Sequence, residues 1–128
     1  MTSAASPPVR VLVVEDNTDV ADSIARFLRV GAGFAVRVAY DGEAGLKAAF
    51  ASPPDAVVCD LAMPRMNGLL VAEELSRRTP RPLLIAVTAF AGAYPEDLAL
   101  LAGFDHYLPK PADPFIVEAL IRAHVAPS

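Results

Sequence analysis

Residues 56–68, AVVCDLAMPRMNG, decide the fold of this chain, because an apolar run ends there in one carboxylate and a loop. Four apolar residues precede Asp60, which predicts a strand buried on both faces, as in a parallel sheet covered by helices. Proline, asparagine and glycine follow and predict a loop. Asp60 is therefore expected at the mouth of a buried strand, where its carboxylate is a candidate nucleophile.

The ends of three further strand candidates carry groups that complement this carboxylate. Glu15 and Asp16 follow the first apolar run, Thr88 follows the fourth, and Lys110 follows the fifth. Because the carboxyl ends of parallel strands meet at one edge of a sheet, we expect these side chains to gather around Asp60.

Short apolar runs alternate five times with segments of helical period, which is typical of βα units that wind a parallel sheet. We expect strands at residues 9–14, 34–38, 56–59, 83–87 and 105–109, and helices that start at residue 17 or 18, at 41–42, after 68, at 95 and at 113–114. The first helix repeats Val20, Ile24, Phe27 and Leu28 on one apolar face. The second strand carries Arg37 and the fifth is polar, so both are expected at the edges. The predicted fold is α/β, a doubly wound sheet of five parallel strands in the order 2-1-3-4-5.

Length and composition predict one domain. The chain has 128 residues, of which 54% are hydrophobic and 20% charged, and this is a globular composition. We expect a disordered lead-in at residues 1–8, the folded domain at 9–125 and a tail at 126–128. The formal charge of −4, with arginine and lysine scattered along the chain, predicts no direct binding of nucleic acid.

The sequence predicts neither membrane insertion nor secretion. The longest apolar stretch, residues 83–94, falls well short of the roughly 20 residues that span a bilayer. Residues 1–8 lack both a basic start and an apolar centre, so they do not resemble a signal peptide. The single cysteine, Cys59, lies inside an apolar run and is expected as a buried thiol. These features predict a cytoplasmic location.

Three carboxylates, those of Glu15, Asp16 and Asp60, repel one another when a fold brings them together. Such a cluster either raises a pKa or binds a divalent cation. Mg²⁺, or Mn²⁺ in its place, suits a site of oxygen ligands that leaves room for water. With the Thr88 hydroxyl and the Lys110 ammonium, the set matches phosphoryl transfer, and the expected product is an aspartyl phosphate on Asp60.

The chain resembles the receiver domain of bacterial two-component response regulators over residues 9–125. The family's motifs stand here as Glu15-Asp16, Asp60-x-x-Met63-Pro64-x-Met66-x-Gly68, Thr88-Ala89 and Lys110-Pro111. The resemblance implies a flavodoxin-like receiver fold of five βα units. It also implies a signalling module that catalyses only its own phosphorylation and dephosphorylation.

By this resemblance, Asp60 takes a phosphoryl group from the phosphohistidine of a sensor histidine kinase or of a histidine phosphotransfer protein. Asp16 and Asp60 would ligate the cation directly and Glu15 through a water molecule. The backbone carbonyl of Ala62 would complete the protein ligands. Glu15 stands where the family often has aspartate, and a ligand that acts through water tolerates this change.

The resemblance also implies a switch. Lys110 and Thr88 would meet the phosphoryl oxygens, and a cis Lys110-Pro111 bond would aim the lysine inward. When Thr88 moves toward the phosphate, the ring of Tyr107 can fill the vacated space and change the surface formed by the fourth helix, the fifth strand and the fifth helix. This surface would regulate a downstream partner that the sequence does not identify.

Two positions near the site predict a long-lived phosphoryl group. Ala62 and Phe90, two residues past Asp60 and Thr88, are apolar and therefore cannot orient a hydrolytic water. Residues 91–95, ahead of the fourth helix, offer no good N-cap, which predicts a mobile segment beside the site.

Two other functions fit part of this pattern. A pseudo-receiver would bind partners without being phosphorylated, but it would not need the complete set of acids, hydroxyl and lysine. A haloacid-dehalogenase-like phosphatase needs a second aspartate two residues after the nucleophile, and Ala62 occupies that place. Residues 103–107 are similar to receivers of hybrid sensor kinases, so both a stand-alone receiver and the receiver of a hybrid kinase stay open.

Overall fold

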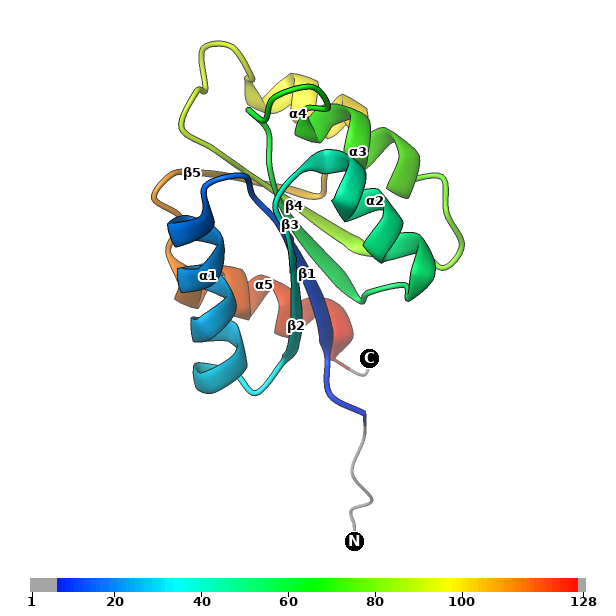
Figure 1. Cartoon of the computed structure of the whole chain (residues 1–128), viewed down its shortest axis with the longest axis vertical. Coiled ribbons are helices and arrows are strands. Elements are labelled where there is room, and N and C mark those ends of the chain that lie inside the picture. Colours follow the sequence, from blue (N-terminus) through cyan, green and yellow to red (C-terminus); the bar gives the residue numbers. More distant parts are fainter. Residues whose placement is uncertain (1–6, 127–128) are drawn as a thin grey trace, which may run out of the picture.

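Five parallel strands form one sheet that organises the chain (Figure 1). The computed structural model describes residues 7–126. The strands are β1 (Arg10–Val14), β2 (Ala35–Ala39), β3 (Ala56–Asp60), β4 (Leu83–Thr88) and β5 (His106–Pro109). Their order is β2-β1-β3-β4-β5 and every neighbouring pair is parallel, which confirms the predicted topology and both edges.

The strand bounds differ from the predicted ones by one residue. β2 starts one residue late, because the Phe34 N–H donates to the carbonyl of Leu28 in the preceding turn. β3 and β4 run one residue further than predicted, so Asp60 and Thr88 are the last residues of their strands. Both residues are still in register with the neighbouring strand. The sheet itself, rather than a loop, therefore holds their backbones.

Helices cover both faces of the sheet. They are α1 (Thr18–Arg26), which continues into one turn of π-helix, η1 (Phe27–Gly31), then α2 (Gly42–Ala51), α3 (Gly68–Leu75), α4 (Glu96–Ala102) and α5 (Pro114–Val125). α1 and α5 lie on one face, and α2, α3 and α4 on the other (Figure 1). Asn17, Asp41 and Asp113 cap α1, α2 and α5 by accepting hydrogen bonds from backbone N–H groups. The predicted helix starts are confirmed within one residue, whereas η1 was not predicted.

Alternate residues of the central strands supply two separate cores. On β1, Val11 and Val13 face the side of α1 and α5, while Leu12 and Val14 face the side of α2, α3 and α4. β3 and β4 are buried along their whole length. Cys59 lies in the core on the α2 side and its thiol is fully buried, as predicted. Unbroken apolar runs therefore mark the strands that are covered on both faces.

A close approach between backbones places α3 against the end of β3. The Gly68 N–H donates to the Leu61 carbonyl at 3.0 Å, and the Asn67 side chain accepts from the first N–H groups of the helix. A Cβ atom on Gly68 would lie 2.3 Å from the Asp60 carbonyl oxygen, so only glycine fits there. Gly68 is thus what lets the loop after β3 turn sharply at Asp60.

The predicted lead-in at residues 1–8 and tail at 126–128 fall mostly on residues 1–6 and 127–128, which lie outside the described part of the chain. Among residues 7–126, the helices lack the length and apolar character that a membrane crossing requires.

Candidate functional site

The acidic residues predicted from sequence come together at the carboxyl end of the sheet. One carboxylate oxygen from each of Glu15, Asp16 and Asp60 lies within 4.8 Å of the others. Glu15 and Asp60 are buried, with 2% and 3% of their surface exposed, whereas Asp16 faces solvent. Glu15 is tied to the sheet, since its N–H donates to the Ala39 carbonyl of β2 at 3.0 Å. Two strands thus hold two of the three carboxylates, and the third opens the cluster to water.

Lys110 reaches into this cluster from the end of β5. Its Nζ lies 2.5 Å from Glu15 Oε1 and 3.4 Å from Asp60 Oδ1. Its backbone N–H donates to the Thr88 carbonyl at 2.8 Å, which joins β5 to β4 beyond the last paired residues. The Lys110-Pro111 bond is cis, as the resemblance implied. One ammonium therefore faces a cluster of three carboxylates.

The electrostatics of Asp60 favour a cation. Burial, followed by the charge of Glu15, raises the pKa of Asp60 to about 7, although Lys110 and the Ala62 N–H at 3.3 Å act in the opposite direction. A divalent cation beside these carboxylates would offset the repulsion that raises this pKa. The donor set is all oxygen and one side of it is open to solvent, which fits Mg²⁺ or Mn²⁺.

Thr88 and Tyr107 lie on the next two strands. Thr88 is buried, and its Oγ1 accepts a hydrogen bond from the Phe90 N–H at 2.9 Å. The Tyr107 ring is half-buried, and its hydroxyl donates to the Tyr94 carbonyl at 2.6 Å. The N-cap of α4 is Pro95, which supplies no capping side chain, as predicted. Tyr107 thus links β5 to the segment that leads into α4, a contact that the sequence did not reveal.

An apolar hollow of about 590 Å³ opens beside Lys110. Val20 and Ile24 of α1 form one wall, and Pro111, Ala112 and Pro114 of the segment between β5 and α5 contribute to the other. The helical repeat places Val20 and Ile24 on the apolar face of α1, and both are half-buried, with Ile24 packed against the core. Ala21 and Ala25 are the fully buried residues of α1. In the sequence, the sign of this hollow is the pair of small residues Ala21 and Ala25, each one position after Val20 or Ile24.

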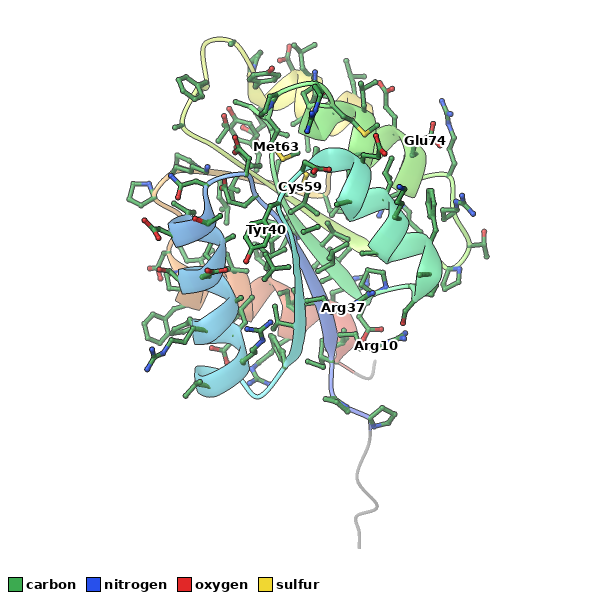
Figure 2. The ribbon with its side chains drawn as sticks, in the orientation of Figure 1. Arg10, Arg37, Tyr40, Cys59, Met63 and Glu74 are labelled. Atoms are coloured by element: carbon green, nitrogen blue, oxygen red, sulfur yellow. The ribbon has the colours of Figure 1, made fainter. Side chains whose placement is uncertain are left out.

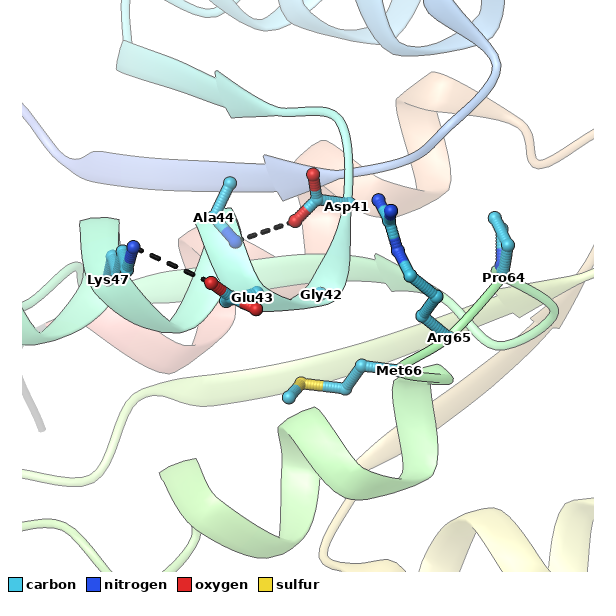
Figure 3. A pocket seen from close by; sticks show the side chains of 8 residues that line it. All are labelled: Asp41, Gly42, Glu43, Ala44, Lys47, Pro64, Arg65 and Met66. Atoms are coloured by element: carbon cyan, nitrogen blue, oxygen red, sulfur yellow. Dashed lines mark hydrogen bonds and ion pairs between the residues drawn. The ribbon is translucent and has the colours of Figure 1, made fainter.

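A second hollow, of about 390 Å³, lies between α2 and the loop that follows Asp60 (Figure 3). Gly42 and Lys47 line it from α2, and Arg65 and Met66 line it from the loop. Arg65 has a φ of 67°, in the left-handed region. A Cβ atom on Gly42 would lie 2.8 Å from the Met66 carbonyl oxygen, so the start of α2 packs directly on the loop. The sequence motif predicted the loop but not the packing of α2 against it.

Fold and site together place an acidic cluster and one lysine at the carboxyl end of a doubly wound sheet, and comparison with known proteins gives the family. A model of the response regulator receiver domain matches residues 11–122, and the chain belongs to this family. The match covers all five strand ends described above. Membership favours the receiver over the phosphatase alternative.

Curated relatives agree with this assignment. The chain is 43% identical over 115 residues to the response regulator MprA of Mycolicibacterium vanbaalenii, a match that covers 89% of this chain and 48% of the relative. It is 41% identical over 114 residues to MprA of Mycobacterium tuberculosis, covering 88% of this chain and 47% of the relative. The chain spans about half the length of the curated relatives it matches.

Solved structures show the same fold. A CheY-like response regulator receiver domain protein from Methanospirillum hungatei superposes with a TM-score of 0.81 at 28% identity, covering 91% of this chain and 92% of that one. The receiver domain of a Francisella response regulator gives a TM-score of 0.81 at 25% identity, with coverage of 91% and 95%. The five-stranded receiver architecture is therefore shared over nearly the whole described chain.

Proposed function

We propose that Asp60 is the phosphoacceptor of this receiver domain. The observation that carries the proposal is the convergence of Glu15, Asp16 and Asp60 with the Lys110 ammonium at adjoining strand ends. One ion pair would be enough to stabilise this end of the sheet, whereas three carboxylates and one ammonium are gathered there. Membership of the receiver family supports the same role.

In the proposed reaction, an oxygen of Asp60 attacks the phosphorus of a phosphohistidine. The P–O bond forms as the P–N bond breaks, and the departing imidazole nitrogen keeps the electron pair of that bond. A bound Mg²⁺ or Mn²⁺ would supply positive charge to the phosphoryl oxygens. Asp16 and Asp60 would hold the cation directly, with Glu15 acting through water and the Ala62 carbonyl completing the set.

Lys110 and Thr88 act on the product. Lys110 carries a charge that suits a phosphoryl oxygen, and its Nζ already lies 3.4 Å from Asp60 Oδ1. Thr88 would donate its hydroxyl to another phosphoryl oxygen. To do so it must turn from its present contact with the Phe90 N–H. The reaction thus couples phosphorylation to a movement at the end of β4.

The phosphodonor is a histidine kinase or a histidine phosphotransfer protein, since receiver domains partner with histidine kinases. The apolar hollow between α1 and the segment after Lys110 supports docking there, because it opens directly beside the site. The chain spans about half the length of its curated relatives. We keep the expectations of a cytoplasmic location and of no direct nucleic-acid binding by this domain.

The experiment that tests this function is intact-mass measurement after incubation with Mg²⁺ and acetyl phosphate. We expect a gain of one phosphoryl group, absent in Asp60→Asn and absent in the wild-type protein with EDTA. If no gain occurs with acetyl phosphate or with phosphohistidine donors, the pseudo-receiver alternative replaces the proposal.

Tyr107 tests the switch. Because its hydroxyl contacts the Tyr94 carbonyl, we expect the ring to report on the surface formed by α4, β5 and α5. Tyr107→Ala should leave the rate of Asp60 phosphorylation within about twofold of wild type but weaken the gain in partner affinity on phosphorylation by about tenfold. Calorimetry with and without phosphorylation measures this. An unchanged gain in affinity would remove Tyr107 from the switch.

Ala62 and Phe90 test the phosphate lifetime. Phe90 is 59% exposed and Ala62 is half-buried, and neither side chain can orient water. We expect slow hydrolysis in the wild type and hydrolysis at least about tenfold faster in the double variant Ala62→Asn, Phe90→Glu, because positioned polar groups assist the attacking water. Decay of the phosphorylated mass with time gives both rates, and equal rates would contradict the expectation.

A further inference from the structure

The backbone of Arg65, in the loop after β3, is strained. Among residues 7–126, Arg65 is the one residue other than glycine with a positive φ, at 67°. The Met66 N–H donates to the Pro64 carbonyl at 2.8 Å, which closes a three-residue turn with Arg65 at its centre. A γ-turn with a positive central φ is rare and strained, and glycine adopts it at the lowest cost. The chain therefore carries an arginine where glycine would be more stable.

Contacts of the Arg65 side chain within the chain do not offset this strain. The side chain is exposed and lines the second hollow, between α2 and the loop. Figure 3 shows it reaching toward Asp41 at the start of α2, with no ion pair between the two. Asp41 instead accepts from the Ala44 N–H at 2.7 Å, and Lys47 Nζ lies 3.5 Å from Glu43 Oε1. Among the described residues, the Arg65 guanidinium is thus the charge in this hollow that has no partner.

The position of Arg65 puts this unpaired guanidinium at the rim of the candidate site. Arg65 follows Asp60 by five residues, and both walls of the hollow start from the carboxyl ends of strands, β2 and β3. At the same edge of the sheet, one lysine faces three carboxylates, so the mouth of the site repels an incoming anion. A phosphoryl group is such an anion. A cation on the rim would lower the barrier to its approach.

We propose that Arg65 binds the phosphoryl group of the phosphodonor at the rim of the site, ahead of its transfer to Asp60. This role rests on the proposed function and adds a residue that acts on the incoming donor. A guanidinium presents a planar fork of N–H donors that suits phosphoryl oxygens, and it keeps its charge throughout the neutral pH range. The strained turn holds this group outside the acidic cluster, where it stays free for the donor.

The rate of phosphorylation by acetyl phosphate in Mg²⁺ tests the proposal, measured by intact mass at low ionic strength. Arg65→Gln should lower the second-order rate constant about fivefold, because it removes the cation that attracts the donor. In about 0.5 M NaCl the difference from wild type should fall below about twofold, since salt screens this attraction. Equal rate constants for wild type and Arg65→Gln at low ionic strength would overturn the proposal.

Arg77→Gln is the matched control, because it removes the same charge from a 75% exposed side chain just beyond the C-terminal end of α3. Its rate constant should stay within about twofold of wild type. An equal loss in Arg77→Gln would mean that only net charge matters, which overturns the role of Arg65. A loss with a phosphohistidine protein as donor but not with acetyl phosphate would overturn it as well, because Arg65 would then contact carboxylates of that protein.

Arg65→Gly separates the proposed role from a role in the fold. Glycine relieves the strain of the turn, so the midpoint of thermal unfolding should stay level or rise by about 1–2 °C. The rate constant with acetyl phosphate should nevertheless fall about fivefold, as in Arg65→Gln. A lower midpoint would show that the arginine side chain stabilises the loop, and the strain would then no longer point to a ligand.

Inorganic phosphate gives a readout that needs no transfer. Added at constant ionic strength, it should shift the Nε–Hε NMR signal of Arg65, identified by its absence in Arg65→Gln, and the backbone amides of Gly42 and Met66. These amides should stay in place in Arg65→Gln, and no shift at Arg65 in wild type would overturn the rim site. If no donor phosphorylates wild type, the proposed function fails, and a shift at Arg65 would then keep the anion site without the transfer.

Discussion

Charged side chains are paired with opposite partners at one end of the sheet and crowd together with like charges at the other. At the amino end, Arg10 lies 4.0 Å from Asp55, and Arg37 donates to two carbonyls at the end of α2, at 2.9 and 2.6 Å. Figure 2 shows Arg10 and Arg37 together at the end of the sheet near both termini, opposite the end that carries Cys59 and Met63. At the carboxyl end, three carboxylates share one lysine.

The amino ends of the strands therefore contribute to stability, and their carboxyl ends carry the candidate site. Charges at the amino end have partners and help to hold the fold. At the carboxyl end, burial and then the charge of Glu15 raise the pKa of Asp60, and a cation or a phosphoryl group can change this balance. The fold tolerates this because the central strands are buried on both faces and fix the backbone of Asp60.

The largest expected effect on stability comes from disrupting the close approach of Gly68 to the end of β3. Gly68→Ala would place a Cβ atom 2.3 Å from the Asp60 carbonyl oxygen and 2.9 Å from Leu61 Cα. Because both neighbours are backbone atoms, the loop must move, and we expect the free energy of unfolding to fall by about 2–3 kcal/mol. Urea denaturation measures this.

Gly92→Ala is the matched control for Gly68→Ala. A Cβ atom on Gly92 would meet nothing within 4 Å, so the free energy of unfolding should stay level or rise by about 0.5 kcal/mol. Equal effects of the two alanines would mean that the approach of α3 to Asp60 is not what requires glycine.

The same aspartate-to-asparagine substitution should have opposite effects at the two ends of the sheet. In EDTA, Asp60→Asn should raise the free energy of unfolding by about 1–2 kcal/mol, because it removes a buried charge whose repulsion by Glu15 and desolvation outweigh its attraction to Lys110. Asp55→Asn should lower it by about 0.5–1 kcal/mol, because Asp55 accepts from the Arg10 N–H at 2.8 Å and pairs with its side chain.

Mg²⁺ should then reverse the order of wild type and Asp60→Asn. A cation that binds only the folded protein stabilises it by mass action, and the variant lacks one of the ligands. Thermal unfolding in EDTA and in Mg²⁺ measures the stability difference between wild type and Asp60→Asn, whose sign should change between the two conditions. A less stable Asp60→Asn in EDTA would show that the carboxyl end is as well balanced as the amino end.

A further pair of variants tests the amino end. Arg37→Ala removes the donors to the Ala48 and Ser52 carbonyls at the C-terminal end of α2, and we expect a loss of about 1 kcal/mol in the free energy of unfolding. Arg77→Ala is the control, because the Arg77 side chain is 75% exposed and pairs only with Glu74, three residues earlier in the chain, at 3.9 Å among the described residues. That variant should change stability by less than about 0.5 kcal/mol. Similar losses from both would remove the special role of Arg37.

Local sequence signals predicted the secondary structure and the topology. Apolar runs and helical repeats placed the strand ends at Asp60 and Thr88 and the helix starts at Asn17, Asp41 and Asp113, and the two polar edge strands with right-handed crossovers gave the strand order. Once parallel strands are ordered, their carboxyl ends must meet at one edge, which brings the acids and Lys110 together.

Contacts between side chains from distant segments were not evident in the sequence. They are the ion pairs of Lys110 with Glu15 and Asp60, the contact of Tyr107 with the Tyr94 carbonyl, and the apolar hollow beside α1. The physical reason is scale. Hydrophobic periodicity places an element within a few ångströms, whereas a hydrogen bond or an ion pair depends on fractions of an ångström between segments far apart in the chain.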